Sequence, residues 1–256
     1  MLSRRSLVLH LVAGMGLVSG GCSDHEKREI PSRRLDAGAF RASATFPDDF
    51  DRIGVVHAWH EPTDDHGQVR VPDLERKLIA AGSAVVVLEV YTGSASEVLV
   101  GELPELSISP DDSAMYARLV ESLRVMKQRY GGKPLDLISV GHGAAACWPV
   151  LALHPDLISS LVAIAVPGVK NLDFATGQRV PVLALHAEGD HHVMETHAFV
   201  HRTLTFGREP HEMIEYDRVR SQFWDESSTE WDATTADDAF DRAARWARQS
   251  VGYTVR

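Results

Sequence analysis

The segment 135–151, which reads LDLISVGHGAAACWPVL, decides the fold. Residues 135–140 form a short, mostly apolar run, which is typical of a buried strand. From Gly143 onward the residues are small or apolar, as in a helix packed on a sheet. Gly141-His142-Gly143 make a tight turn between the two. A strand that turns directly into a helix is the repeating unit of α/β sheets, so the segment predicts that architecture.

The same alternation continues on both sides of this segment. Strands are predicted at 53–59, 83–91, 135–140, 161–167, 180–188 and 212–219, and helices at 71–82, 111–131, 143–155, 194–207 and 235–252. Repeated strand–helix units predict a mostly parallel central sheet with helices on both faces. The connection 168–179 has about a dozen residues, which is too few for a separate lid domain.

Composition fits one domain and narrows the possible partners. The chain has 256 residues, of which 44% are hydrophobic, so it can bury a full core. Its net charge of -10 argues against nucleic-acid binding and against electrostatic adsorption to anionic lipid, both of which need a basic face. Cys22 and Cys147 lie in unrelated contexts, so we expect no disulfide between them.

The N-terminus has the layout of an export signal. Arg4 and Arg5 precede an apolar run, 7–18, and small residues lead up to Cys22. That run is about a dozen residues long, short of the roughly 20 that a membrane-spanning helix needs. SRRSLV resembles a twin-arginine motif, and LVSGGC resembles a bacterial lipoprotein cleavage site.

We therefore expect residues 1–21 to be a removed signal peptide and Cys22 to carry lipid. The protein would then be exported and anchored to a bacterial membrane, facing the periplasm or the exterior. A plain signal peptide is the alternative. Residues 22–52 are polar and weakly periodic and are predicted to be a tether, with a short strand near 40–46, and the folded domain is predicted to span 53–256.

Sites of α/β sheets lie beyond the carboxyl ends of the strands. Histidines are frequent at these positions, together with Asp190 after the predicted strand 180–188. We expect a cleft lined by His57, Trp59, His60, His142 and His191.

These segments resemble the α/β-hydrolase fold and, within it, the dienelactone hydrolase-like branch, over roughly 53–251. VVHAW resembles the strand before the oxyanion loop, and ISVGHGAAA resembles the nucleophile elbow. VPVLALHAEGDHHV resembles the segment with the triad acid, and IEYDRVRSQFWD resembles the segment with the triad histidine.

The resemblance implies that two of the three catalytic residues are missing. The acid position falls on Asp190, but the nucleophile position falls on Gly143 and the histidine position on Ser221. No histidine follows His211, so a triad in the order nucleophile, acid, histidine cannot be assembled. The amides of Ala58 and Ala144 are expected to form an anion-binding nook.

Other nucleophiles and ligands fit this sequence less well. Ser139 lies inside a predicted strand and Cys147 lies past the turn, whereas Ser221 would need His60, His191 or His192 to approach it in space. Gly141-x-Gly143-x-x-Ala146 also fits a dinucleotide fingerprint, but no acid ends the next strand to bind a ribose.

Two further features have competing interpretations. His57, His142 and His186 with Asp190 would suit zinc, but histidines at such strand ends commonly pack under the site, so we expect no metal and no cofactor. Asp190 could equally cap the helix that follows it. The aromatic residues of the last loop and helix are expected to pack that helix onto the sheet rather than line a pocket: Phe223, Trp224, Trp231 and Trp246.

The leading expectation for function is a non-catalytic lipoprotein that binds a small-molecule or polymeric ligand, or a partner, at the former active site. The alternative is an active ester or lactone hydrolase with a rearranged or metal-assisted site, built from Asp190 and nearby histidines.

Overall fold

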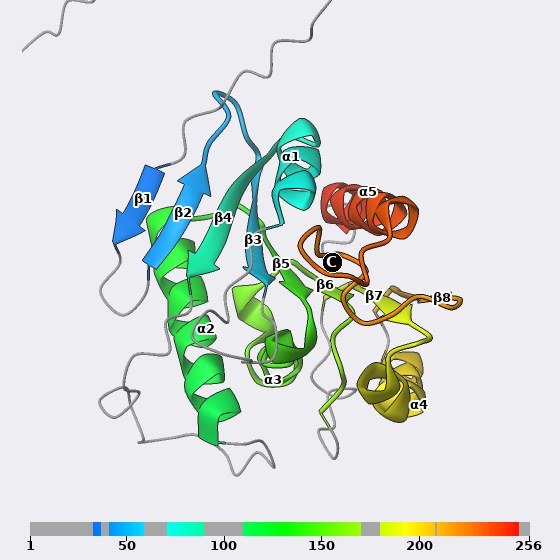
Figure 1. Cartoon of the computed structure of the whole chain (residues 1–256). Helices are drawn as coiled ribbons and strands as arrows, with labels where there is room; N and C mark the ends of the chain where they lie inside the picture. Colours follow the sequence, from blue (N-terminus) through cyan, green and yellow to red (C-terminus); the bar gives the residue numbers. More distant parts are fainter. Residues whose placement is uncertain are drawn as a thin grey trace, which may run out of the picture.

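The computed structural model describes residues 33–36, 41–58, 71–89, 110–169, 180–207 and 209–250. Within these ranges, eight strands form one sheet in the order β1-β2-β4-β3-β5-β6-β7-β8 (Figure 1). All neighbouring pairs from β4 to β8 are parallel, whereas β1–β2 and β2–β4 are antiparallel. The strands are β1 (Arg33–Asp36), β2 (Arg41–Thr45), β3 (Arg52–Ala58), β4 (Ser83–Glu89), β5 (Leu135–Val140), β6 (Ser160–Ile164), β7 (Val182–Ala187) and β8 (His211–Tyr216).

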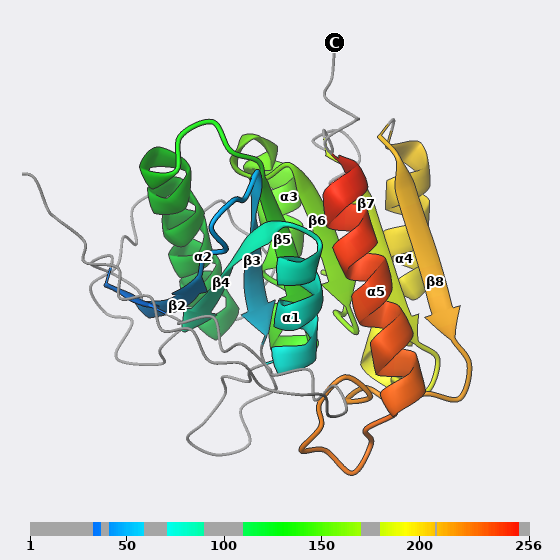
Figure 2. The same ribbon diagram turned by 90° about the horizontal axis from the view of Figure 1, so that it is seen from above.

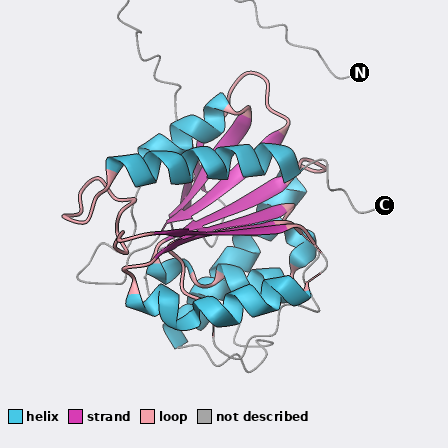
Figure 3. Ribbon diagram, turned by 90° about the vertical axis from the view of Figure 1, so that its right-hand side faces the viewer, coloured by secondary structure: helices cyan, strands magenta, loops and turns pink. Residues whose placement is uncertain are grey.

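Helices cover both faces of the sheet, as Figures 2 and 3 show. The first layer holds α1 (Pro72–Ala80) and α5 (Ala233–Gln249), which pack against each other. The second layer holds α2 (Pro110–Arg129), α3 (Cys147–Leu153) and α4 (His191–Phe206). Two short 3-10 turns, His142–Ala144 and Pro155–Leu157, flank α3. The expected α/β architecture is therefore confirmed.

Burial explains the sequence pattern of the strands. Every residue of β3, β5, β6 and β7 is buried, as expected for parallel strands covered on both faces. The strand at the end of the sheet, β8, is only partly buried. Two apolar cores result, one between the sheet and α1 with α5, and one between the sheet and α2, α3 and α4.

The predicted helix 143–155 is divided in the structure. A 3-10 turn at His142–Ala144 precedes α3, which begins only at Cys147 and ends at Leu153. Pro149 lies in the first turn of α3, where no backbone N–H is needed, so it produces no kink inside the helix. The next predicted helix, 194–207, starts earlier than expected, at His191.

The sheet includes residues that the sequence assigned to the tether. The predicted strand near 40–46 is confirmed as β2, which pairs with β4, and β1 pairs with β2 at the edge. The sheet therefore begins upstream of residue 53, where the sequence analysis placed the start of the domain. The expected signal peptide, Cys22, Trp59 and His60 lie outside the described residues. None of the described helices is both long enough and apolar enough to cross a membrane.

A buried polar network ties the end of α5 to the sheet. Arg52, which is 1% exposed, donates from Nη1 to Asp136 Oδ2 at 3.2 Å. The other carboxylate oxygen of Asp136 accepts from Ser160 Oγ at 2.7 Å and Ser250 Oγ at 3.2 Å. Because Asp136 is fully buried, these bonds replace the water it loses on folding.

Candidate functional site

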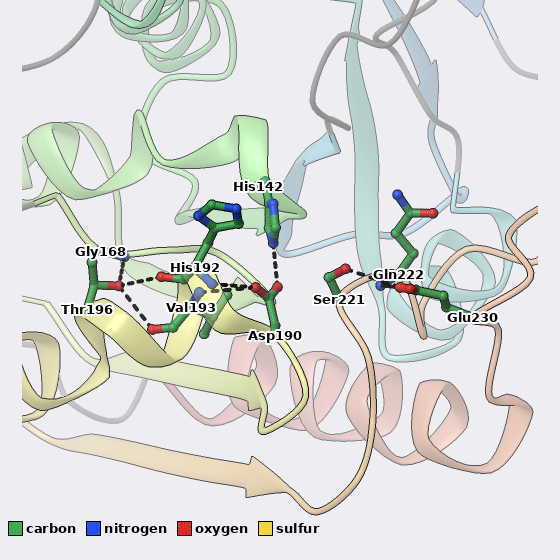
Figure 4. A network of polar contacts seen from close by, with 9 residues as sticks. All are labelled: His142, Gly168, Asp190, His192, Val193, Thr196, Ser221, Gln222 and Glu230. Carbon is green, nitrogen blue, oxygen red and sulfur yellow. Dashed lines mark hydrogen bonds and ion pairs between the residues drawn. The ribbon is translucent and has the colours of Figure 1, made fainter.

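Three loops at the carboxyl ends of β5, β7 and β8 carry the candidate site. His142 follows β5, Asp190 follows β7, and Ser221 lies in the loop after β8. Figure 4 shows Asp190 directly below His142, to which a dashed line joins it, and Ser221 to the right of this pair on its own loop. The loops are bonded together, because Gly189 N–H donates to Val219 O at 2.8 Å and Arg218 N–H donates to Glu188 Oε2 at 3.1 Å.

Asp190 caps a helix with one carboxylate oxygen and contacts a histidine with the other. Its Oδ1 accepts the backbone N–H groups of His192 at 3.0 Å and Val193 at 3.1 Å, so it caps α4. Its Oδ2 is hydrogen-bonded to His142 Nε2 (Figure 4). The residue is 3% exposed, so the carboxylate makes these contacts in place of solvent.

His142 therefore takes the place beside the acid that the resemblance gave to position 221. It comes from the elbow itself, immediately before Gly143, and not from the loop after β8. His142 and Asp190 are 48 residues apart. Sequence analysis placed both near the site but did not predict that they bond each other, and their separation along the chain gives no signal for it.

The elbow differs from the one that the resemblance implied. Gly143 lies within the 3-10 turn, while the left-handed backbone falls on Gly141, with φ of 85°. Glycine adopts this conformation without steric cost. The N–H of Ala144 donates to Gly141 O at 3.1 Å, so this amide is engaged in the turn. The predicted nook at Ala58 and Ala144 therefore lacks a free donor at Ala144.

Ser221 is held by another carboxylate. Its hydroxyl donates to Glu230 Oε2 at 3.1 Å, and the N–H of Gln222 donates to the same oxygen at 3.1 Å. Arg220 Nη1 lies 3.5 Å from Glu230 Oε1. Glu230 thus fixes the loop at the position where the resemblance expects a catalytic histidine, a role that the sequence did not reveal.

The other strand-end histidines have different surroundings. His57 and His186 are buried, and within the part of the chain that the structure describes no group is hydrogen-bonded to their ring nitrogens. Burial lowers the pKa of each imidazole to about 4, and His197 contributes for His186. By contrast, His191 and His192 are exposed at the start of α4, and the His192 ring meets that of His142 at 5.4 Å between centroids.

The rival nucleophiles are inside the protein. Ser139 is a fully buried residue of β5. Cys147 is also fully buried, and this raises the pKa of its thiol to about 12. A thiol with that pKa is a poor nucleophile at neutral pH. Among the residues that the structure describes, no three histidine, cysteine or carboxylate side chains are arranged to hold a metal ion.

The aromatic residues of the last loop pack as the sequence predicted. Phe223 is 0% exposed and Trp224 is 2% exposed, both in the core beneath α1 and α5. Trp231 and Trp246 pack against the same core. They attach the last helix to the sheet.

Comparison with known proteins gives matches to solved structures. A protein from Klebsiella pneumoniae assigned as a dienelactone hydrolase superimposes with a TM-score of 0.62 at 22% identity, over 82% of this chain and 93% of the other. Dienelactone hydrolase from Anabaena variabilis gives 0.61 at 14% identity, over 88% and 98%. The chain has the α/β-hydrolase fold.

More distant solved structures share this fold. Est1E from Butyrivibrio proteoclasticus gives a TM-score of 0.59 at 9% identity, over 86% of this chain and 99% of the other. No protein-family model matches the sequence, and no curated protein matches it either. The expected resemblance is thus confirmed for the α/β-hydrolase fold, while the reaction must be argued from the site.

Proposed function

We propose that this α/β-hydrolase-fold protein binds a small-molecule or polymeric ligand around His142 and Asp190 and does not use a serine triad. One observation carries the proposal: the acid Asp190 is bonded to a histidine from the elbow, where the nucleophile would stand. With Gly143 at the nucleophile position, no side chain there can attack a carbonyl.

The remaining hydroxyl does not restore the missing chemistry. The Ser221 hydroxyl donates its hydrogen bond to Glu230 Oε2, and no imidazole among the described residues is hydrogen-bonded to it as a base. When nucleophile and base are removed from a triad, the residual rate is orders of magnitude lower. Binding is therefore the function that this arrangement supports best.

Polar groups near the pair suit a ligand with hydroxyl or carboxyl groups. The His142 side chain is 16% exposed, whereas the Asp190 side chain is 1% exposed. Of the two side chains, the His142 imidazole is therefore the one that a ligand from solvent can contact, together with the exposed His191 and His192. Imidazoles donate and accept hydrogen bonds, which suits such a ligand.

The proposal includes export and lipidation at Cys22. The described fold begins at Arg33, so ten residues, 23–32, separate it from Cys22. Fully extended, they reach at most about 40 Å, which keeps the domain near the membrane surface. Mass spectrometry of the purified protein tests this, since Cys22→Ala should abolish the acyl modification and release the protein from membranes.

The catalytic part is tested by esterase turnover of the mature chain on short aryl esters and a lactone. We expect no turnover by the wild type and little by Gly143→Ser/Ser221→His, because His142 already occupies Asp190 Oδ2. Adding His142→Ala should free the acid and produce turnover that Asp190→Ala abolishes. Turnover by the wild type that requires His142 would refute a purely binding role.

The binding part is tested with butyrate, γ-butyrolactone and a set of short oligosaccharides. Ligand-observed NMR should detect at least one complex with the wild type and lose it with His142→Ala. His201→Ala is a matched control, because His201 is exposed on α4 and stacks on His197 instead. Binding that survives His142→Ala would place the ligand elsewhere.

A second candidate is hydrolysis by a rearranged site, and the His142–Asp190 bond is the observation that favours it. A carboxylate that orients an imidazole is the arrangement of a general base, which could activate a water molecule. His142→Gln would then abolish turnover and Ser221→Ala would not. Loss of turnover with a chelator would indicate the metal-assisted version.

A further inference from the structure

A single peptide group connects the two helices that follow the site residues. Gly168 N–H donates to Thr196 Oγ1 of α4 at 2.7 Å. Trp148 Nε1–H of α3 donates to Pro167 O at 2.9 Å. Pro167 O and Gly168 N–H belong to the same peptide unit, so one rigid plane is bonded to α3 on one side and to α4 on the other.

The packing around this peptide group leaves little room for movement. A Cβ placed on Gly168 would lie 2.5 Å from Val200 Cγ2 and 3.2 Å from Thr196 Cβ. The backbone at residue 168 is therefore in direct contact with α4. Trp148 is 0% exposed and Thr196 is 6% exposed, while Pro167 and Gly168 are half-buried, so both bonds are partly shielded from water.

Both helices lead directly to the site pair. His142 lies in the turn before α3, five residues ahead of Cys147, where α3 begins. Asp190 caps α4, and Thr196 also donates to Val193 O at 3.0 Å in the first turns of that helix (Figure 4). The position of α3 relative to α4 consequently sets where the imidazole meets the carboxylate.

We propose that Trp148 and Thr196 are positioning residues, which hold the His142–Asp190 hydrogen bond through the Pro167–Gly168 peptide group. The proposal builds on the site described above but on neither candidate function. A hydrogen bond on one side of a peptide group polarises the group and strengthens the bond on its other side. The two contacts should therefore act as one unit.

The test is NMR of the ring protons of His142, which need no ligand and no turnover. The Nε2–H signal is assigned by its loss in His142→Gln, and its exchange with water is measured. We expect Trp148→Phe and Thr196→Val each to speed this exchange by about fivefold or more. Each substitution removes one of the two hydrogen bonds to the Pro167–Gly168 peptide group. A failed binding assay leaves this outcome unaffected, so the two proposals can fail separately.

Matched controls separate positioning from general loss of stability. Thr203→Val removes a similar buried hydroxyl of α4, which donates to Phe199 O at 2.8 Å, whereas Gly168 N–H donates to Thr196. Trp246→Phe removes an indole N–H that has no hydrogen-bond partner in the described ranges of the chain. Both controls should leave the exchange of the His142 proton unchanged, even where they lower the melting temperature.

The double variant Trp148→Phe/Thr196→Val tests whether the two hydrogen bonds act together through the Pro167–Gly168 peptide group. If the peptide group acts as a single connection, the double variant exchanges no faster than the faster single variant. Effects that multiply would show two independent contacts and overturn the inference. Wild-type exchange in both single variants would overturn it as well.

Discussion

Acidification is expected to destabilise the fold through His57, whose imidazole is fully buried and has no hydrogen-bond partner among the described residues. Burial lowers the pKa of His57 to about 4, from the ordinary value of 6.5 for an imidazole in water. The unfolded chain therefore binds a proton more readily than the folded chain, and the stability of the fold rises with pH. This contribution is fully present above the unfolded pKa and is lost as the pH falls toward the folded one.

The difference between the two pKa values sets the magnitude. Between about pH 8 and about pH 5, one such histidine should cost about 2 kcal/mol of unfolding free energy, and roughly 3 kcal/mol once the pH falls below 4. His186 has the same direction of shift and adds to the loss. His57→Leu removes one titrating group with little change in volume. Between about pH 8 and about pH 5, the unfolding free energy of this variant should therefore fall by about 2 kcal/mol less than that of the wild type.

The assay is urea unfolding followed by tryptophan fluorescence at both pH values. Ile53→Val on the same strand, also fully buried, is the control, because it removes a methylene group but no titratable group. It should cost about 1 kcal/mol at each pH and leave the pH dependence unchanged. If His57→Leu loses as much stability on acidification as the wild type, the imidazole is charged or paired in the fold and the reasoning is wrong.

Three further substitutions test the packing around the site and the sheet. Arg52→Met leaves the carboxylate of Asp136 buried without its cation and should cost about 3–5 kcal/mol, while Arg52→Met/Asp136→Leu should recover most of it in urea unfolding. Gly189→Ala places a Cβ 2.6 Å from Val219 O and should lower stability by about 1–3 kcal/mol, whereas Gly131→Ala, with its nearest atom 3.9 Å away, should be tolerated. Asp190→Ala should cost about 1 kcal/mol by removing the cap of α4, whereas Asp190→Asn should keep most of that stability but weaken the His142 contact seen by NMR. Equal losses for the two Asp190 variants would show that capping is not what the residue supplies.

The sequence predicted those elements whose pattern is set by burial. Helices cover both faces of the sheet at β5 and β7, so both strands are apolar along their length and were recognisable in the sequence. The edge strand β1 reads RRLD, which has no such run, and it forms because β2 offers it a partner. That pairing is a tertiary interaction, so a polar segment was read as a tether.

The site was predictable in its positions but not in its bonds. Residues 143, 190 and 221 follow the strands β5, β7 and β8, so all three lie beyond the carboxyl ends of parallel strands, where the sequence analysis expected a site. Which side chain reaches Asp190 depends on the backbone of the elbow, where the left-handed residue is Gly141 and the turn continues through His142. The bond between Ser221 and Glu230 depends likewise on how the last loop folds back on itself.

The two carboxylate oxygens of Asp190 have different roles, one in the stability of the fold and one in the candidate site. Oδ1 serves the helix, since it accepts two backbone N–H groups at the start of α4. Oδ2 serves the site, since it meets His142. The capping contact stabilises the fold whether or not a nucleophile stands at position 143, so the presence of an acid here is no evidence for catalysis. What the acid does for the site depends on its histidine partner, and that partner is the same in both candidate functions. Binding and hydrolysis are therefore distinguished by whether His142 is required for turnover or only for ligand binding, and not by the presence of the acid.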